Sequence, residues 1–354
     1  MNRVVVALTL VLLAAPASAA TLNASAVNDA SFPAKLAKDH KNHEPSAGIV
    51  KLQVLLDRAQ FSPGEIDGSL GENAQKALLA FAQDQGLPTD KPLTPELWDK
   101  LTSLSSDPAI TDYTITAEDV KGPFLKKLPA KMEQMKSLPS LGYTSAREEL
   151  AEKFHMSQQL LSALNPGKKF DRAGQVITVA NVPLRRERMN VARIEVDKTA
   201  QTVRAFDPSG HVIAFYPATV GSADKPTPSG TLKVVSSDAH PTYRYNPKYH
   251  FKGVKSREPF TIKSGPNNPV GSYWIGLSAE GYGIHGTAEP GKVSKAESHG
   301  CVRLTNWDAR ALGDSVKRGT PVVFLDAPET PVAAQPNTGE QGDQTVGRAG
   351  GSTQ

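Results

Sequence analysis

The sequence predicts a multidomain α+β chain, with a helical unit first, a mixed unit second and a mostly-β unit third. Apolar residues recur at helical spacing within residues 47–102, and apolar and polar residues alternate at strand spacing from residue 192 onward. Residues 142–183 contain two short helical patterns and then one apolar strand pattern. A length of 354 residues is enough for about two or three domains, and 39% hydrophobic residues can supply their cores.

The helical unit is predicted from its spacing and its turn residues. A first helix carries Ile49, Leu52 and Leu56 on one face, and a turn-rich segment with three glycines follows at residues 61–71. A second helix is expected from about Glu72 to Gln85, ended by Gly86, and a third short helix begins at Pro95. Prolines punctuate the next segment, 103–141, and no period lasts there, so we expect a linker with some local structure.

The mixed unit and the mostly-β unit follow this linker. In residues 142–183, helices are expected near residues 148–154 and 157–164, and a strand is expected at 174–180. In the third unit, strands are expected near residues 193–197, 201–206, 211–220, 230–236, 272–277 and 321–325. A helix is expected to begin with a capping box from Thr305 to Asp308. The long segment 237–269 is expected to be a lid or a substrate wall.

The two ends of the chain are expected to lie outside the fold. Residues 1–19 have a cationic start, a continuous apolar run and a small-residue cleavage site, which together predict a Sec-type signal peptide. The apolar run is too short to span a membrane, and no cysteine follows it, so the mature protein is expected to be exported, soluble and without a membrane span. Residues 327–354 have almost no apolar side chains and are expected to be disordered.

The net charge of +4 is mild and is spread along the chain. No basic block marks a nucleic-acid-binding surface, although the charge would suit an anionic polymer.

The chain has one cysteine, Cys301. In exported proteins structural cysteines come in pairs, so an odd cysteine is either a liability or a functional thiol. A small buried hydrophobic residue is the alternative interpretation. Two histidines lie close in sequence, His285 sixteen residues upstream and His299 two residues before the thiol. Either imidazole could accept the thiol proton and act as a general base, and a backbone carbonyl such as that of Gly286 could orient it. Gly300 would let the backbone turn tightly, so that the amides of Gly300 and Cys301 could both point at a developing oxyanion.

The role of Arg303 and the possibility of metal binding each have more than one interpretation. Arg303 could hold a substrate carboxylate, or it could be a salt-bridged surface arginine. A metal hydrolase is the alternative chemistry, because several side chains offer ligands, namely His240, His250, His285, His299 and Cys301. None of them has the short fixed spacing of a zinc motif, so we expect no metal and no cofactor.

The helical unit resembles the small three-helix peptidoglycan-binding domain. The resemblance rests on Leu52-Gln53, residues 64–71, Phe81-Ala82-Gln83, residues 86–88 and residues 93–101. A helical bundle without a ligand is the alternative.

The mixed unit resembles a LysM module, another glycan binder. This resemblance rests on residues 143–154, 160–166 and 174–179, and it departs at the start, where Ser145-Ala146-Arg147-Glu148 replaces the usual Gly-Asp-Ser/Thr-Leu.

The third unit, residues 191–326, resembles the YkuD-type L,D-transpeptidase catalytic domain. The resemblance rests on Ile284-His285-Gly286 and on Ser298-His299-Gly300-Cys301-Val302-Arg303, with further similarity at residues 227–230 and 265–271. It implies a β-sandwich with Cys301 as nucleophile and His285 as general base, supported by His299, Gly300, Gly286 and Ser298. Arg303 stands where the common pattern has asparagine.

The implied reaction is acyl transfer in the periplasm on peptidoglycan, the expected partner through both its glycan and its stem peptide. The thiol would attack a tetrapeptide stem, and an amine would resolve the thioester into a 3→3 cross-link or a wall-attached protein, for example one of the outer membrane. Resolution by water would make the enzyme an L,D-carboxypeptidase, and a catalytically silent peptidoglycan-binding protein is the other alternative.

Overall fold

The computed structural model describes residues 22–34, 45–221, 227–249, 253–295 and 300–326. The expected signal peptide and C-terminal tail lie outside these ranges, as do Ser298, His299 and His250. Within the described residues, no helix combines the length and the apolar character needed to cross a membrane.

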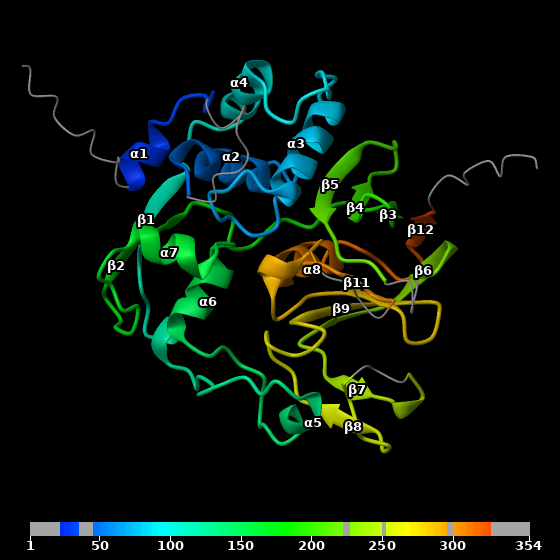
Figure 1. The fold of residues 1–354 in the computed structure, drawn as a ribbon. Helices are drawn as coiled ribbons and strands as arrows, with labels where there is room; N and C mark the ends of the chain where they lie inside the picture. Colours follow the sequence, from blue (N-terminus) through cyan, green and yellow to red (C-terminus); the bar gives the residue numbers. More distant parts are fainter. Residues whose placement is uncertain (1–21, 35–44, 222–226, 250–252, 296–299, 327–354) are drawn as a thin grey trace, which may run out of the picture.

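The helical unit has the three helices that the sequence predicts, packed around one apolar core (Figure 1). Its helices are α2 (Ala47–Arg58), α3 (Glu72–Asp84) and α4 (Pro95–Ser103), preceded by the short α1 (Ala24–Asn28). Gly86 follows α3 with a φ of 65°, a left-handed conformation that favours glycine. Thr94 begins α4 by accepting a hydrogen bond from the Leu97 amide, and Pro95 occupies the first turn.

The mixed unit contains a strand that was expected to be part of a linker. Its elements are β1 (Ile110–Thr114), η1 (Glu118–Val120), α5 (Met132–Met135), α6 (Ala146–Lys153), α7 (Gln158–Leu164) and β2 (Val176–Ala180). Strand β1 pairs antiparallel with β2, with Ile110 opposite Ala180. Part of the expected linker 103–141 is therefore a paired strand. The sequence did not indicate this strand, because its pairing partner lies far along the chain and leaves no local signal.

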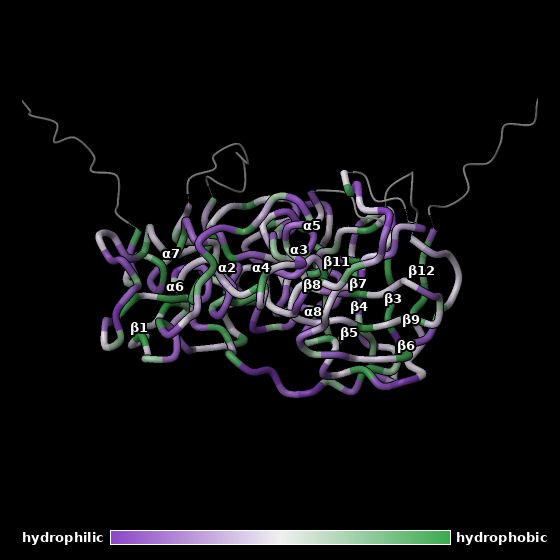
Figure 2. Tube along the Cα trace, turned by 90° about the horizontal axis from the view of Figure 1, so that it is seen from below, coloured by the Kyte–Doolittle hydropathy of each residue, from purple (hydrophilic) through white to green (hydrophobic). Residues whose placement is uncertain are grey.

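The third unit is built on one strongly curled sheet. In the described residues its eight strands lie in the order β11-β10-β9-β6-β12-β3-β4-β5. Their bounds are β3 (Arg193–Asp197), β4 (Thr202–Phe206), β5 (Val212–Pro217), β6 (Gly230–Ala239), β9 (Tyr273–Leu277), β10 (Gly283–His285), β11 (Val302–Arg303) and β12 (Pro321–Leu325). Figure 2 shows this sheet beside the helical units, with hydrophobic stretches along its strands.

The two edges of the sheet meet, which corrects the expected sandwich of two sheets. Thr219, just after edge strand β5, exchanges two backbone hydrogen bonds of 2.9 and 2.8 Å with Arg303 on the other edge. Register shifts in the β4–β5 and β6–β9 pairs are the irregularities that allow a sheet to bend. The apolar core of the unit lies against α8 (Asn306–Gly313), which packs on β9.

The segment 237–269, expected as a lid or a wall, forms the end of β6 and then a separate two-stranded sheet. This small sheet pairs β7 (Tyr243–Tyr245) with β8 (Phe260–Ile262), and the 3-10 turn η2 (Pro247–Tyr249) follows β7. The rings of Tyr245 and Phe260 stack with their centroids 4.7 Å apart.

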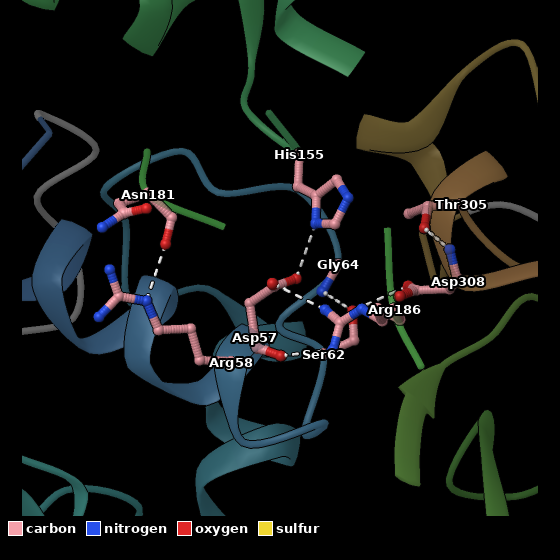
Figure 3. A network of polar contacts seen from close by, with 9 residues as sticks. All are labelled: Asp57, Arg58, Ser62, Gly64, His155, Asn181, Arg186, Thr305 and Asp308. Atoms are coloured by element: carbon pink, nitrogen blue, oxygen red, sulfur yellow. Dashed lines mark hydrogen bonds and ion pairs between the residues drawn. The ribbon is translucent and has the colours of Figure 1, made fainter. Parts of the chain in front are cut away.

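A buried polar network joins the helical unit to the other two (Figure 3). Its centre is Asp57 of α2, whose carboxylate lies 2.9 Å from His155 Nδ1 and 2.7 Å from Arg186 Nη2. Burial by itself would raise the pKa of Asp57, but the charges and hydrogen bonds of Arg186 and His155 outweigh it and lower that pKa. His155 in turn stacks on Trp307 of α8, with ring centroids 5.0 Å apart.

A second set of contacts fastens the helical unit directly to the curled sheet. Phe215 of β5 exchanges backbone hydrogen bonds with Gln60 and Ser62, each 2.9 Å long. The Ser62 hydroxyl also donates to Asp308 Oδ2 at the start of α8, at 2.8 Å. Because these contacts are buried, the helical unit is held in one place relative to α8 and to the sheet.

The network gives a stability prediction. Asp57→Ala should lower the free energy of unfolding at pH 7 by about 3–5 kcal/mol, because Arg186 would keep a buried charge without its carboxylate. Since the pKa of Asp57 is lowered in the folded protein, its contribution is present above its ordinary value and is lost as the pH falls through the folded value. Urea denaturation measures the change, with Asp84→Ala on an exposed part of α3 as control. Equal stability of the two variants would contradict the prediction.

Candidate active site

Three neighbouring strands bring the predicted catalytic residues to one face of the sheet. Trp274 of β9 pairs with His285 of β10, and His285 pairs with Arg303 of β11. Side chains alternate between the faces of a strand, so Cys301, two residues before Arg303, lies on the same face as His285. The intervening Val302 is buried in the core on the opposite face.

His285 is held by one hydrogen bond and one ring contact. It is 4% exposed, its Nδ1 lies 2.7 Å from the Gly286 carbonyl oxygen, and its ring stacks on Trp274 with centroids 5.6 Å apart. A carbonyl oxygen can only accept, so Nδ1 carries the proton and Nε2 keeps its lone pair. This is the carbonyl that the sequence suggested as an orienting group.

Burial and the charge of Arg303 lower the pKa of His285 to about 3, although the hydrogen bond to Gly286 opposes the shift. The imidazole is therefore neutral at pH 7 and able to accept a proton.

Cys301 forms no disulfide and keeps part of its surface accessible, while the protein covers most of its sulfur. Burial raises the pKa of the thiol, and a backbone hydrogen bond from Gly283 and the charge of Arg303 reduce that rise. Its Sγ lies 3.5 Å from the Gly281 carbonyl oxygen. The resting pair is thus a neutral thiol and a neutral imidazole.

Gly300, before the thiol, has a φ of 100°, where residues with a side chain are strained. This agrees with the tight turn that the sequence predicts at this position.

Arg303 lies close to Cys301 and His285 and next to the small sheet. Burial lowers the pKa of its guanidinium, while the charges of Cys301, Glu289 and Tyr243 raise it. Tyr243 belongs to β7, so the segment expected to be a lid or a wall does reach the surroundings of Arg303. Arg303 is partly buried rather than fully exposed.

Two residues that the sequence did not single out shape the site. Trp274 covers one side of His285, and its indole fills the space over Gly283, where an added Cβ would come within 2.5 Å of the ring. Asn306 Oδ1 lies 2.1 Å from the place where a Cβ of Gly286 would be. No local sequence pattern marks these contacts. Each brings together residues from two elements, β9 with β10 or α8 with the end of β10, that meet only when the sheet curls.

These contacts predict that Gly286 cannot be replaced. Gly286→Ala should slow acylation of Cys301 at least tenfold and should destabilise the fold by about 1–3 kcal/mol, because Asn306 and the Gly286 carbonyl cannot both keep their places. The matched control is Gly71→Ala, since an added Cβ there meets no atom within 4 Å. Acylation kinetics and thermal unfolding measure the two effects. A Gly286→Ala enzyme that acylates at the wild-type rate would contradict this account of the site.

A polar groove of about 600 Å³ lies where the three units meet. It is lined by Glu65 of the helical unit, by Glu148 and Glu152 of α6, and by residues 288–292, which include the 3-10 turn η3 (Pro290–Lys292). Burial, with the charge of Asp67, raises the pKa of Glu65 to about 7.

The ligands suggested for a metal hydrolase are not gathered in the part of the chain that the structure describes. There, no group of three or more His, Cys, Asp or Glu side chains is placed to hold a metal ion.

Comparison with known proteins gives two family matches and several relatives. Residues 191–324 match the L,D-transpeptidase catalytic domain (YkuD), and residues 45–101 match a peptidoglycan binding domain. Residues 142–183 lie outside both matched regions. A protein of Bacillus licheniformis named as L,D-transpeptidase YkuD is 31% identical over 177 residues, which cover 49% of this chain and 90% of the relative. The Escherichia coli protein named as L,D-transpeptidase YbiS is 28% identical over 192 residues, covering 53% of this chain and 62% of the relative.

Solved structures include L,D-transpeptidases that overlap parts of the chain. One from Xylanimonas cellulosilytica has a TM-score of 0.34 at 15% identity and covers 78% of this chain and 92% of its own. One from Mycobacterium smegmatis has a TM-score of 0.32 at 20% identity, and the match covers 43% of this chain and 64% of the other.

The family match over the curled sheet places the protein among the acyltransferases, and specifically among the transpeptidases. The chain belongs to the YkuD-type L,D-transpeptidase family. Its second matched region supports peptidoglycan as its partner.

Proposed function

We propose that this protein is an exported, periplasmic L,D-transpeptidase that acts on tetrapeptide stems of peptidoglycan through a thioester at Cys301. The observation that carries the proposal is the place of His285 on β10, beside the strand β11 that Cys301 directly precedes, with its Nδ1 bound to the Gly286 carbonyl and its Nε2 left to act as a base.

In the first half of the reaction, Cys301 Sγ attacks the carbonyl carbon of the third stem residue while His285 Nε2 takes the thiol proton. The bond to the terminal D-alanine then breaks, the imidazolium gives its proton to the leaving amine, and an acyl thioester remains on Cys301. Because the pKa of His285 is low in the resting site, the imidazolium is a transient species and returns its proton readily.

In the second half, an acceptor amine attacks the thioester carbonyl, His285 takes a proton from that amine, and the thiol is restored with its proton. The backbone amides at Gly300 and Cys301 are our candidates for oxyanion donors, because the positive φ of Gly300 turns the chain sharply there. Arg303, partly buried and paired in register with His285, is our candidate for binding a substrate carboxylate.

The accessory units are proposed to hold the enzyme against its polymer. The helical unit, with its match to a peptidoglycan binding domain, would bind the wall, and the mixed unit with β1, α6, α7 and β2 is proposed as a LysM-like module. Their buried contacts with α8 and β5 support delivery of substrate at a fixed orientation to the thiol.

The test is incubation with a disaccharide-tetrapeptide, followed by mass spectrometry of the products. A transpeptidase releases one D-alanine for each dimer with a 3→3 link, whereas a carboxypeptidase releases D-alanine and leaves a free tripeptide. Binding of the stem without any product would show a silent peptidoglycan-binding protein instead. A labelled acceptor amine then identifies which nucleophile resolves the thioester.

A further inference from the structure

Helix α6 belongs to the mixed unit, outside the matched catalytic region, yet one of its side chains reaches the back of the catalytic site. Glu152 Oε1 accepts a hydrogen bond of 2.9 Å from Asn306 Nδ2 and one of 3.2 Å from the Tyr143 hydroxyl. Asn306 is the first residue of α8 and is buried. The contact therefore joins the accessory unit to the catalytic unit by a partly buried hydrogen bond.

The Asn306 side chain packs against Gly286, the residue whose carbonyl orients the proposed catalytic histidine. Its Oδ1 accepts a hydrogen bond of 2.9 Å from the Ser272 amide. The same oxygen occupies the space where side chains would project from Gly271 and Gly286, at 2.1 Å from each ideal Cβ position. Because this oxygen packs against Gly286, the orientation of the Asn306 amide and the position of the Gly286 backbone are coupled, and the Gly286 carbonyl binds His285 Nδ1.

Glu152 is one of two acceptors that fix this rotation. Asn306 Nδ2 also donates to the Pro266 carbonyl oxygen, at the longer distance of 3.2 Å. The loop that carries Pro266 is itself tied to the accessory unit, because Asn267 Nδ2 donates to Gly142 O at 3.0 Å and to Glu148 Oε1 at 2.9 Å. Both acceptors of the Asn306 amide thus depend on residues 142–152.

We propose that Glu152 is a positioning residue for the catalytic histidine, acting through Asn306 and the Gly286 carbonyl, so that the accessory unit completes the geometry of the active site. This inference rests on the proposed role of His285 as the base. It makes the mixed unit a structural part of the catalytic apparatus, whether or not that unit also binds glycan.

The protonation of Glu152 determines which substitution is conservative. Burial raises the pKa of its carboxyl to about 8, against the hydrogen bonds from Asn306 and Tyr143, which lower it. At neutral pH the group is mainly the neutral acid, and glutamine reproduces its shape, its charge and its acceptor oxygen.

The experiment compares kcat and KM for stem turnover at pH 7 in the wild type and in four variants. We expect Glu152→Ala to lower kcat on the order of tenfold to a hundredfold with little change in KM, because misorientation of a catalytic group affects the reaction more than substrate binding. Glu152→Gln should restore kcat to near the wild-type value. Glu149→Ala, on the same helix, should behave as the wild type, since its charged neighbours are Asp119, Lys153 and Glu118 of its own unit. Glu152→Asp withdraws the carboxyl by one methylene and tests the same contact if the alanine variant does not fold.

An unchanged kcat in folded Glu152→Ala and Glu152→Asp would overturn the inference, as would a loss in Glu152→Gln equal to that in Glu152→Ala. His285→Gln serves in parallel to separate the two proposals. If His285→Gln remains active, the proposed base is wrong, whereas an inactive His285→Gln beside fully active Glu152 variants rejects only the positioning role.

Discussion

Cys301→Ser is expected to lower stem turnover by about 10³-fold or more and to abolish covalent capture of a carbapenem. A serine hydroxyl is far less acidic than a thiol, and the neighbouring imidazole is a weak base because burial and Arg303 lower the pKa of His285 to about 3. Such a base can assist the departure of a thiol proton but not that of an alcohol proton. The site is therefore suited to cysteine and not to its oxygen analogue.

Intact-protein mass spectrometry after exposure to imipenem measures this effect. Because Cys301 is the only cysteine of the chain, the wild type should gain one adduct and the serine variant none. Ser209→Ala, in an exposed turn of the sheet unit, provides the matched control and should form the adduct at the wild-type rate. An adduct on the folded Cys301→Ser protein would show that the reactive nucleophile lies elsewhere.

His285→Gln is expected to lower kcat/KM by about 10²- to 10⁴-fold, the usual contribution of a general base. The pH profile of the wild type gives a sharper test. The base works while it is neutral, that is above its pKa, and activity is lost as the pH falls through that value. With a pKa of about 3, kcat/KM should show no loss near pH 6.5, where an ordinary histidine titrates. Toward high pH it should rise as the thiol, whose pKa is raised by burial, ionises.

Acylation rates between pH 4 and pH 9, with circular dichroism to verify the fold, measure this profile. An acidic limb with a midpoint near pH 6.5 in the wild type would contradict the buried, carbonyl-bound state of His285. Wild-type kcat/KM in His285→Gln would contradict its role as base.

The local features of the fold could be predicted from the sequence. Helix α3 and its end at Gly86, the start of α4 at Pro95 and the hydrogen bond from the Asp308 amide to Thr305 at the start of α8 all follow from residues within a few positions of one another. Strand β1 and the closure of the sheet between Thr219 and Arg303 could not be predicted, because both pair segments that lie far apart in the chain.

In the candidate site, too, the local features could be predicted and the long-range contacts could not. The types and spacing of Cys301 and His285 suggest the chemistry, and the Gly286 carbonyl could be named as an orienting group, because it follows the histidine directly. The support behind that carbonyl could not be inferred, since Asn306 and Glu152 meet only after the accessory unit packs on α8. The low pKa of His285 could not be predicted either, because it depends on burial and on the charge of Arg303 on the neighbouring strand.

The most direct test of the account is isolation of the acyl-enzyme itself. The wild-type protein is mixed with a disaccharide-tetrapeptide, quenched in acid, digested and sequenced by mass spectrometry, with Cys301→Ala treated in parallel. We predict a disaccharide-tripeptide bound to Cys301 as a thioester, together with one free D-alanine for each modified protein. Release of D-alanine by Cys301→Ala, or an acyl group on any other residue of the wild type, would contradict the proposed thioester mechanism.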